Sequence, residues 1–272
     1  MMRALRRWLE HPLTRGLDLD DPLTTRLRRR IVAEKRFLHR IYEEWYAALA
    51  ASLPPGDGPV LELGSGAGFL ADFIPGLVRS EVFYTPGIDA VLDGLALPFA
   101  AGSLRGIAMT NVLHHLPRPL RFFAEAARCV RPGGVVTMIE PWVTPWSKLV
   151  YGRLHHEPFD PAAAEWELPG GGPLSGANGA LPWILFARDR ERFERAAPEW
   201  RLRSITPIMP FRYLVSGGIS LRGLMPAASF AAWRGLERAL APLSGRLAMF
   251  AQVVMERREA PAALPPTFTR SP

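Results

Sequence analysis

An acidic residue, Glu62, ends a short apolar run and is followed by glycines at alternate positions, Gly64, Gly66 and Gly68. The run at 60–63 is typical of a buried strand. Glycine has no Cβ, so the chain can turn sharply here and let a ligand approach the backbone. Apolar residues at helical spacing follow, which predicts a strand, a glycine turn and a helix. Ligands bind at such turns, beyond the carboxyl ends of strands.

The chemistry of this turn favours a cationic ligand over a phosphate. The spacing differs from the dinucleotide fingerprint G-x-G-x-x-G because Phe69 occupies the sixth position, and the Gly-Lys-Ser/Thr of a P-loop is absent. The Glu62 carboxylate would repel a phosphate and attract an amino group. S-adenosylmethionine (SAM) carries an amino group and no phosphate. Glu81 follows 19 residues later (81 − 62 = 19), where a carboxylate can bind a ribose diol; the alternative is a surface acid at a strand start.

The stretch E-x-G-x-G-x-G resembles the first motif of the class I SAM-dependent methyltransferases, and the chain looks like their type 11-like domains. This resemblance implies an α/β fold with a Rossmann-like, seven-stranded, mostly parallel sheet, flanking helices and an antiparallel last strand. It assigns Glu62, Gly64, Ser65, Gly66 and Gly68 to the binding of SAM.

A second stretch, D-G-x-x-L-P-F at 93–99, is similar to the segment that holds adenine in this family. The resemblance implies that Asp93 accepts a hydrogen bond from the adenine amino group. The backbones of Gly94 and Leu95 would contact the ring. The alternative for Asp93 is the capping of a turn.

A third stretch, at 107–117, resembles the family motif whose loop lines the methyl group and the substrate. The resemblance implies that Asn111 lies at a strand end beside the cofactor, with His114 and His115 just after it. Imidazole titrates near neutral pH, so His115 is our candidate general base; the alternative is a histidine that packs in its loop. The two histidines and the glutamate at 155–157 lack the spacing of a zinc site, so no metal is expected.

The composition fits one sizeable domain with additions, since the chain has 272 residues and is 48% hydrophobic. A single cysteine, Cys129, fits a reducing compartment. No run of eighteen apolar residues occurs and the N-terminus lacks the apolar core of a signal peptide, so we expect a cytoplasmic location. The net charge is +7, but nearly all of the basic residues are arginines, which we attribute to the composition of the source genome.

The periodicities divide the chain into three parts. Residues 1–53 are expected to form an N-terminal helical extension, with one long amphipathic helix at about 26–52. Residues 54–258 form the methyltransferase domain, with an aromatic-rich insertion at about 141–187 expected to be a lid or substrate wall, and 259–272 form a disordered tail. Strands are expected at 60–63, 80–84, 88–93, 107–111, 135–140, 200–208 and 247–256, and helices from the glycines to about 77 and at 119–130, 188–197 and 226–240.

Two further expectations concern the N-terminal extension. Its basic residues near 28–40 fit a solvated face, and the alternative is peripheral contact with a membrane surface. In similar methyltransferases a helix before the first strand covers the cofactor, so Tyr42 or Tyr46 either faces the site or packs in the core.

The function expected from these observations is SAM-dependent methyl transfer, by in-line displacement, to a small-molecule acceptor or a lipid- or sugar-linked one. Two alternatives are open. The pI of about 10.3 suggests an RNA or protein methyltransferase, and a non-catalytic SAM-fold scaffold is the other. The sequence has no Asn/Asp-Pro-Pro-aromatic tetrad and no separate RNA-binding module, so a nucleic-acid partner is not favoured. The oligomeric state is not predicted.

Overall fold

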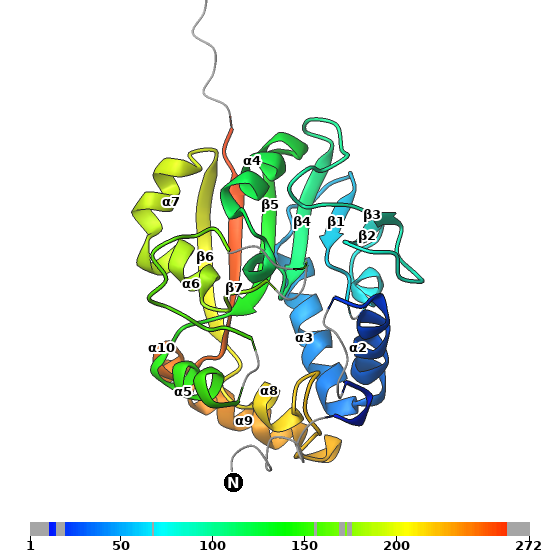
Figure 1. The fold of residues 1–272 in the computed structure, drawn as a ribbon, viewed down its shortest axis with the longest axis vertical. Coiled ribbons are helices and arrows are strands. Elements are labelled where there is room, and N and C mark those ends of the chain that lie inside the picture. Colours follow the sequence, from blue (N-terminus) through cyan, green and yellow to red (C-terminus); the bar gives the residue numbers. More distant parts are fainter. Residues whose placement is uncertain are drawn as a thin grey trace, which may run out of the picture.

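The computed structural model describes residues 11–14, 20–66, 68–154, 157–168, 172 and 176–259. Its centre is a seven-stranded sheet with the strand order β3-β2-β1-β4-β5-β7-β6 (Figure 1). Strands β1 to β5 pair in parallel, whereas β7 is antiparallel to both of its neighbours, β5 and β6. The predicted Rossmann-like sheet with an antiparallel last strand is therefore confirmed. The strands are β1 (Val60–Leu63), β2 (Leu77–Glu81), β3 (Ala90–Val91), β4 (Leu104–Thr110), β5 (Val130–Pro141), β6 (Trp200–Ile208) and β7 (Phe250–Arg257).

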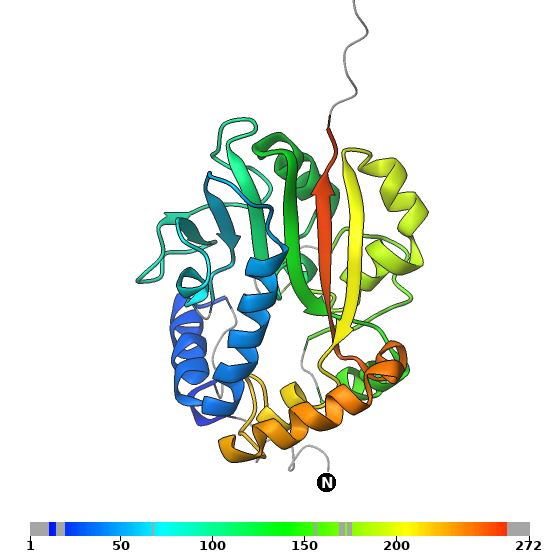
Figure 2. The same ribbon diagram turned by 180° about the vertical axis from the view of Figure 1, so that it is seen from behind.

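Apolar side chains on alternate strand positions feed two core layers, one on each face of the sheet. In β4, Ile107 and Met109 join one layer and Ala108 joins the other. Helix α4 (Pro119–Cys129) covers the first face and α3 (Arg36–Ser52) the second (Figures 1 and 2). The apolar stripe predicted for the N-terminal extension is the buried face of α3: Phe37, Leu38, Ile41, Tyr42, Trp45, Tyr46 and Leu49.

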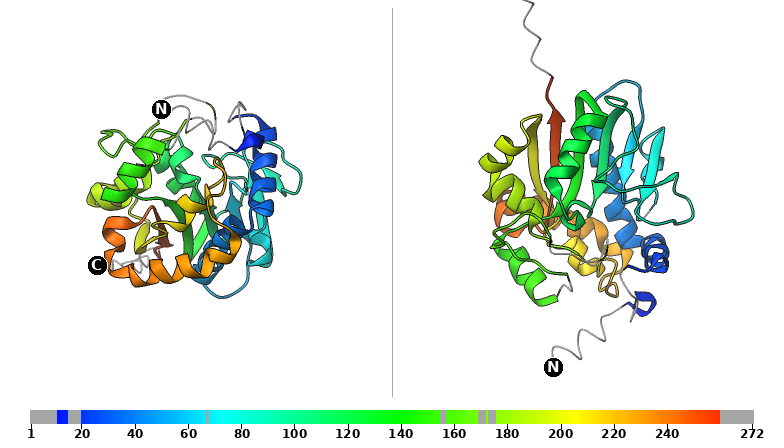
Figure 3. Two further views of the ribbon diagram at one scale, coloured as in Figure 1. Left: turned by 90° about the horizontal axis from the view of Figure 1, so that it is seen from below. Right: turned by 45° about the horizontal axis from the view of Figure 1, so that its top comes forward.

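The parallel strands end at the lower edge of the sheet in Figure 1, and several helices gather there (Figures 1 and 3). These are α2 (Pro22–Glu34), α5 (Pro145–Leu154), α8 (Arg212–Ser216), α9 (Phe230–Ala239) and α10 (Ser244–Leu247). The remaining helical segments are η1 (Pro12–Thr14), η2 (Leu70–Asp72), η3 (Leu113–His115), α6 (Leu181–Trp183), η4 (Ile184–Arg188), α7 (Arg190–Ala196), η5 (Ala227–Ser229) and η6 (Ala241–Leu243). No helix in the described part of the chain is long and apolar enough to span a membrane.

The single helix expected at about 26–52 is wrong, because two helices meet at Lys35. This residue leaves helical geometry, with φ −83° and ψ 83°. Its Nζ donates to the carbonyl oxygens of Gly218 and Leu221, in the loop after α8. Burial lowers the pKa of Lys35 to about 8. The chain therefore bends where its ammonium group is bound by a distant loop, a contact that helical periodicity does not reveal.

The helix expected from the glycines to about 77 is also wrong. Within its described residues, 64–66 and 68–76, the segment contains only the short η2 before β2 begins at Leu77. The ring of Phe69 stacks on His39 at 4.5 Å and meets Tyr46 edge-on at 4.6 Å, both between ring centroids. This segment is thus held by the aromatic face of α3 rather than by a helix of its own.

Five strands begin or end away from their expected positions, including β4, which begins three residues earlier than expected, and β7, which begins three residues later. Strand β2 lies three residues earlier than expected, β3 has only two residues, and β5 already begins at Val130. As the sequence suggested, residues 82–89 between β2 and β3 contain no helix. Because β2 begins and ends earlier than expected, Glu81 lies at the carboxyl end of this strand and not near its start. The predicted domain boundaries at 53 and 258 stay predictions.

Candidate functional site

A cavity of about 400 Å³ lies at the carboxyl ends of β1, β2 and β4. The strand ends and their loops form one wall, which includes Gly64, Glu81 and Asn111. Helices α2 and α3 add Arg28, Tyr42 and other residues, and the insertion adds Leu168, Gly172 and Gly176. This volume is within the range of small-molecule sites, and the location is where ligands bind in open α/β sheets.

Most of the residues predicted to bind the cofactor lie in the wall of this cavity: Gly64, Gly66, Glu81, Asp93, Gly94, Leu95 and Asn111. Glu62, Ser65 and Gly68 lie beside the cavity and are not part of its wall. The candidate base His115 lines the cavity, whereas His114 does not. The structure therefore brings residues from four separate loops to one place.

The carboxylate of Glu81 fixes the glycine turn against β2. Oε1 accepts a hydrogen bond from the backbone N–H of Gly66 at 2.8 Å, and Oε2 accepts one from Val82 at 3.2 Å. Burial raises the pKa of Glu81, and these backbone donors oppose the shift. Because the side chain is only 6% exposed and ends β2, the alternative of a surface acid is wrong.

Gly64 and Gly66 of the turn need to be glycine for different structural reasons. Gly64 has φ +72°, and a Cβ there would lie 2.5 Å from Cγ2 of Val112, so the fold itself requires glycine. At Gly66 a Cβ would meet only the carbonyl oxygen of Gly64, at 3.9 Å. Since Gly66 lines the cavity, a side chain there would occupy ligand space without disturbing the protein.

Three buried polar atoms beside the turn have no hydrogen-bond partner among the described residues: Oε2 of Glu62, Oγ of Ser65 and Nε of Arg29. Burial raises the pKa of Glu62 to about 7, and the nearby Ser65 hydroxyl lowers it without forming a hydrogen bond of standard geometry. Arg29 lies directly against Gly68, where a Cβ would clash with its guanidinium. A buried carboxylate oxygen and a buried guanidinium nitrogen without partners fit a ligand that carries both an amino group and a carboxylate, as SAM does. Arg29 was missed because no local pattern connects it to the glycines.

The loop after β4 is held by Glu140, a second residue that sequence reasoning missed. Its Oε1 accepts hydrogen bonds from the backbone N–H groups of Val112 and Leu113, at 2.8 and 2.7 Å. Its Oε2 lies 2.6 Å from Nδ1 of His114. Asn111, just before this loop, has φ +57°, a strained conformation for a residue other than glycine. Glu140 therefore fixes the backbone that presents Asn111 and His115 to the cavity.

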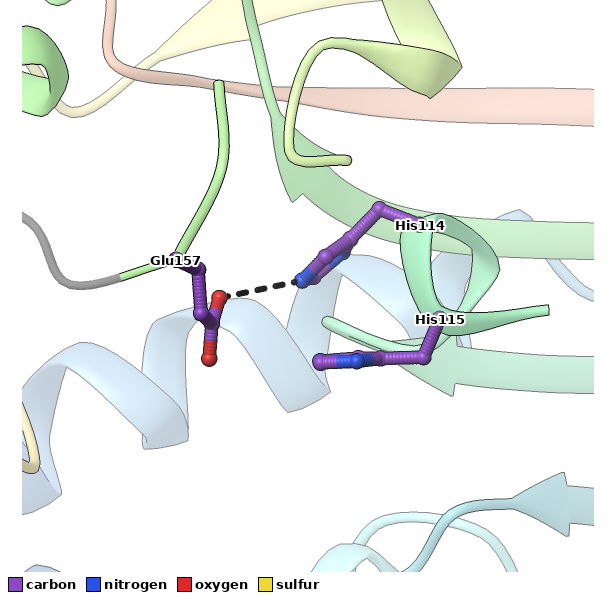
Figure 4. A group of neighbouring side chains, drawn as sticks. All are labelled: His114, His115 and Glu157. Atoms are coloured by element: carbon purple, nitrogen blue, oxygen red, sulfur yellow. Dashed lines mark ion pairs between the residues drawn. The ribbon is translucent and has the colours of Figure 1, made fainter. Parts of the chain in front are cut away.

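The two histidines of this loop lie side by side, with Glu157 opposite them (Figure 4). Their electrostatic environments are opposite. Burial acts to lower the pKa of His114, but the carboxylates of Glu140 and Glu157 raise it to about 9. Burial and the neighbouring His114 lower the pKa of His115 to about 3. The rings lie 4.2 Å apart between centroids, and Nδ1 of His115 is 3.3 Å from the carbonyl oxygen of Gly176. His115 is thus an uncharged imidazole in the cavity wall at neutral pH.

The insertion and the extension both contribute residues to the cavity wall, but not every aromatic residue of the insertion does so. Trp146 donates to the carbonyl oxygen of Pro210, and neither Trp146 nor Trp183 lines the cavity. Tyr42 and Tyr46 both line it and also pack in the core, so both expected roles are met.

The basic residues of the extension do not form one solvated face. Besides Lys35, Arg29 donates to the carbonyl oxygen of Pro86, Arg40 lies over the ring of Phe230, and Arg28 lines the cavity.

Comparison with known proteins gives the family. A family model described as a methyltransferase domain matches residues 33–200, more than half of the chain. An uncharacterized methyltransferase of Mycobacterium tuberculosis is 27% identical over 219 residues, which cover 65% of this chain and 86% of that protein. Another, from Mycobacterium avium, is 34% identical over 120 residues, or 40% of this chain and 47% of that protein.

Solved structures resemble the chain more distantly. Geranyl diphosphate C-methyltransferase from Streptomyces coelicolor is 15% identical, with a TM-score of 0.46 over 85% of this chain and 83% of that one. Nothing about the acceptor follows from a likeness of this size, and the type 11-like assignment stays a prediction. The family match, together with the motif order and the sheet that the motifs predict, shows that the chain belongs to the methyltransferase-domain family and is a class I SAM-dependent methyltransferase.

Proposed function

We propose that the enzyme methylates a small-molecule acceptor, or a lipid- or sugar-linked one, by in-line displacement. One observation carries this proposal: the cavity that contains the predicted cofactor wall is also lined by α2, α3 and the insertion. Bound SAM supplies a methyl group on a positively charged sulfur. The protein then has to align the acceptor with that group and exclude water.

The cofactor side of the cavity is assigned to the strand ends. In this proposal Gly66 gives the ligand access to the backbone, and Glu81 faces the ribose while it holds the glycine turn. Asp93 faces the adenine, although its Oδ1 also accepts a hydrogen bond from the N–H of Leu95 at 2.9 Å, as a turn residue would. The carboxylate of Glu62 would bind the amino group of SAM, and the guanidinium of Arg29 would bind its carboxylate.

The acceptor side is assigned to the part of the cavity that α2 and the insertion line. Thr25 and Arg28 come from α2 and Leu168 from the insertion, so the wall combines apolar surface with one cation. An RNA or a folded protein would have to insert a base or a side chain between these two elements. A cytoplasmic location and peripheral membrane contact stay predictions.

The acceptor class is tested by incubating the enzyme with labelled SAM and fractionated cell extract. We expect label in a small-molecule or lipid fraction that survives treatment with ribonuclease and protease. Label that disappears after ribonuclease treatment, or that stays with protein, would establish the alternative instead.

The first prediction concerns Gly66. Gly66→Val should abolish SAM binding while the fold survives, because the added side chain fills ligand space and its Cβ lies no closer than 3.9 Å to the nearest protein atom, the carbonyl oxygen of Gly64. Calorimetry with SAM and circular dichroism measure the two effects. Gly235→Val, in open space on α9, is the matched control and should bind SAM as the wild type does. Undiminished affinity in Gly66→Val would place the cofactor elsewhere.

The second prediction concerns the pH dependence of SAM affinity. A cationic group beside Glu62 favours its ionised form, and the pKa of this residue is about 7 without a ligand. Binding below pH 7 must therefore release a proton, so affinity should fall as the pH falls from 7 to 5, by at most about tenfold per pH unit. Above about pH 8 affinity should level off. Calorimetry over this range should show a flatter profile for Glu62→Gln, whereas the exposed Asp72→Asn should keep the wild-type profile.

The third prediction concerns His115 as the proposed base. His115→Ala should leave SAM affinity unchanged. If His115 takes the proton of the acceptor, turnover should fall by roughly a hundredfold or more. Calorimetry and product formation, measured on the same preparations, separate the two effects. Turnover close to that of the wild type would show that His115 is not the base.

A further inference from the structure

His114, His115 and Glu157 combine metal-binding chemistry with close geometry. One ring nitrogen of each histidine and one carboxylate oxygen of Glu157 lie within 4.8 Å of one another (Figure 4). Nε2 of His114 is 3.6 Å from Oε2 of Glu157. Two imidazoles and one carboxylate are a ligand set that catalytic sites use for Zn²⁺ and related divalent transition metals.

The surroundings of the two histidines match those of metal ligands. A histidine that binds a metal usually donates its other ring N–H to a carboxylate or a carbonyl, which fixes the ring orientation. Nδ1 of His114 lies 2.6 Å from Oε2 of Glu140, and Glu140 is itself held by two backbone N–H groups. Nδ1 of His115 faces the carbonyl oxygen of Gly176. Both rings therefore have an outer partner in place.

We propose that His114, His115 and Glu157 bind one divalent transition-metal ion and leave an open coordination position toward the cavity. His115 lines the cavity, which gives the ion access to a ligand there. The sequence argued against a metal because the spacing at 155–157 does not suit one. The structure instead joins Glu157 to the histidines of the loop after β4, while His155 and His156 lie outside the described residues.

The geometry requires only a small adjustment. Ligand atoms about 2.1 Å from a tetrahedral zinc ion are about 3.4 Å apart, so the three groups must close by roughly an ångström. His114 is fully buried and fixed by Glu140. Glu157 comes from the insertion and its side chain is 15% exposed, against 2% for His114, so we assign the adjustment to Glu157.

A metal here would define the acceptor more closely. An acceptor hydroxyl that binds the open position would have a lower pKa and would lose its proton to water more easily. Acceptors with an oxygen that can bind the ion are therefore favoured. This catalytic role rests on the proposed function, whereas binding of the ion does not. With the ion bound, His115 is a ligand and not the general base, so a loss of turnover in His115→Ala has to be compared with the ion content of that variant.

The test measures the ion alone, on tag-free protein dialysed against a chelator and then freed of it. Calorimetry with Zn²⁺ should show one ion per chain, and Co²⁺ should give the visible absorption of a four- or five-coordinate site. Glu157→Gln and His115→Gln should each weaken Zn²⁺ binding by about tenfold or more and should remove the Co²⁺ absorption. SAM affinity and circular dichroism should stay unchanged in Glu157→Gln, which separates loss of the metal from loss of the fold or the cofactor site.

Two controls make the result specific to these residues. His39→Ala removes another histidine near a glutamate, 3.8 Å from Glu43, and should bind Zn²⁺ as the wild type does. The double variant His155→Ala/His156→Ala should also keep the ion. No Zn²⁺ binding by the wild type, full binding by Glu157→Gln, or loss only in the double variant would overturn the proposal. Metal binding without any methyl transfer would leave the metal site standing and remove the proposed function.

Discussion

The buried carboxylate of Glu140 is the interaction on which the substrate side of the site depends. A buried charge is costly unless it is paired and hydrogen-bonded, and Glu140 receives two backbone N–H groups and the ring of His114. A hydrogen bond to a charged group contributes about 1.5–3 kcal/mol, so this set supports the strained φ of Asn111. Because Glu140 ends β5 and the loop follows β4, the pairing of these two strands positions the loop.

The N-terminal extension completes the cofactor side. Helix α3 buries its aromatic stripe against the sheet and also holds Phe69, so the chain after the glycines needs no helix of its own. The bend at Lys35 then directs α2 over the strand ends, where Arg28 lines the cavity and Arg29 reaches the glycine turn. One helical pair therefore provides core packing, a cavity wall and a cation beside the turn.

The sequence predicted what depends on local pattern. The strand-and-glycine signal located β1 and its turn, because a buried apolar run followed by alternating glycines has few other structures. Asp93, Gly94 and Asn111 reached the cavity wall because each follows a strand, and parallel strands end at the same edge of the sheet. Glu81 lines the same cavity although its strand was misplaced, and its carboxylate bonds to Gly66; its contact with the ribose stays a prediction.

The contacts that escaped prediction all join segments far apart in the chain. Glu140 lies at the end of an apolar strand, and nothing in its neighbours indicates that its acceptors will serve a loop 28 residues earlier. Glu157 directly follows His155 and His156, so the sequence suggested those two histidines as its neighbours rather than His114 and His115. Its partner His114 belongs to a loop that the insertion contacts through Asn178, which bonds both to the backbone of His114 and to Asp160. The set of side chains that meet at this site therefore depends on how the insertion folds back on the sheet. The spacing of residues along the chain does not predict this fold.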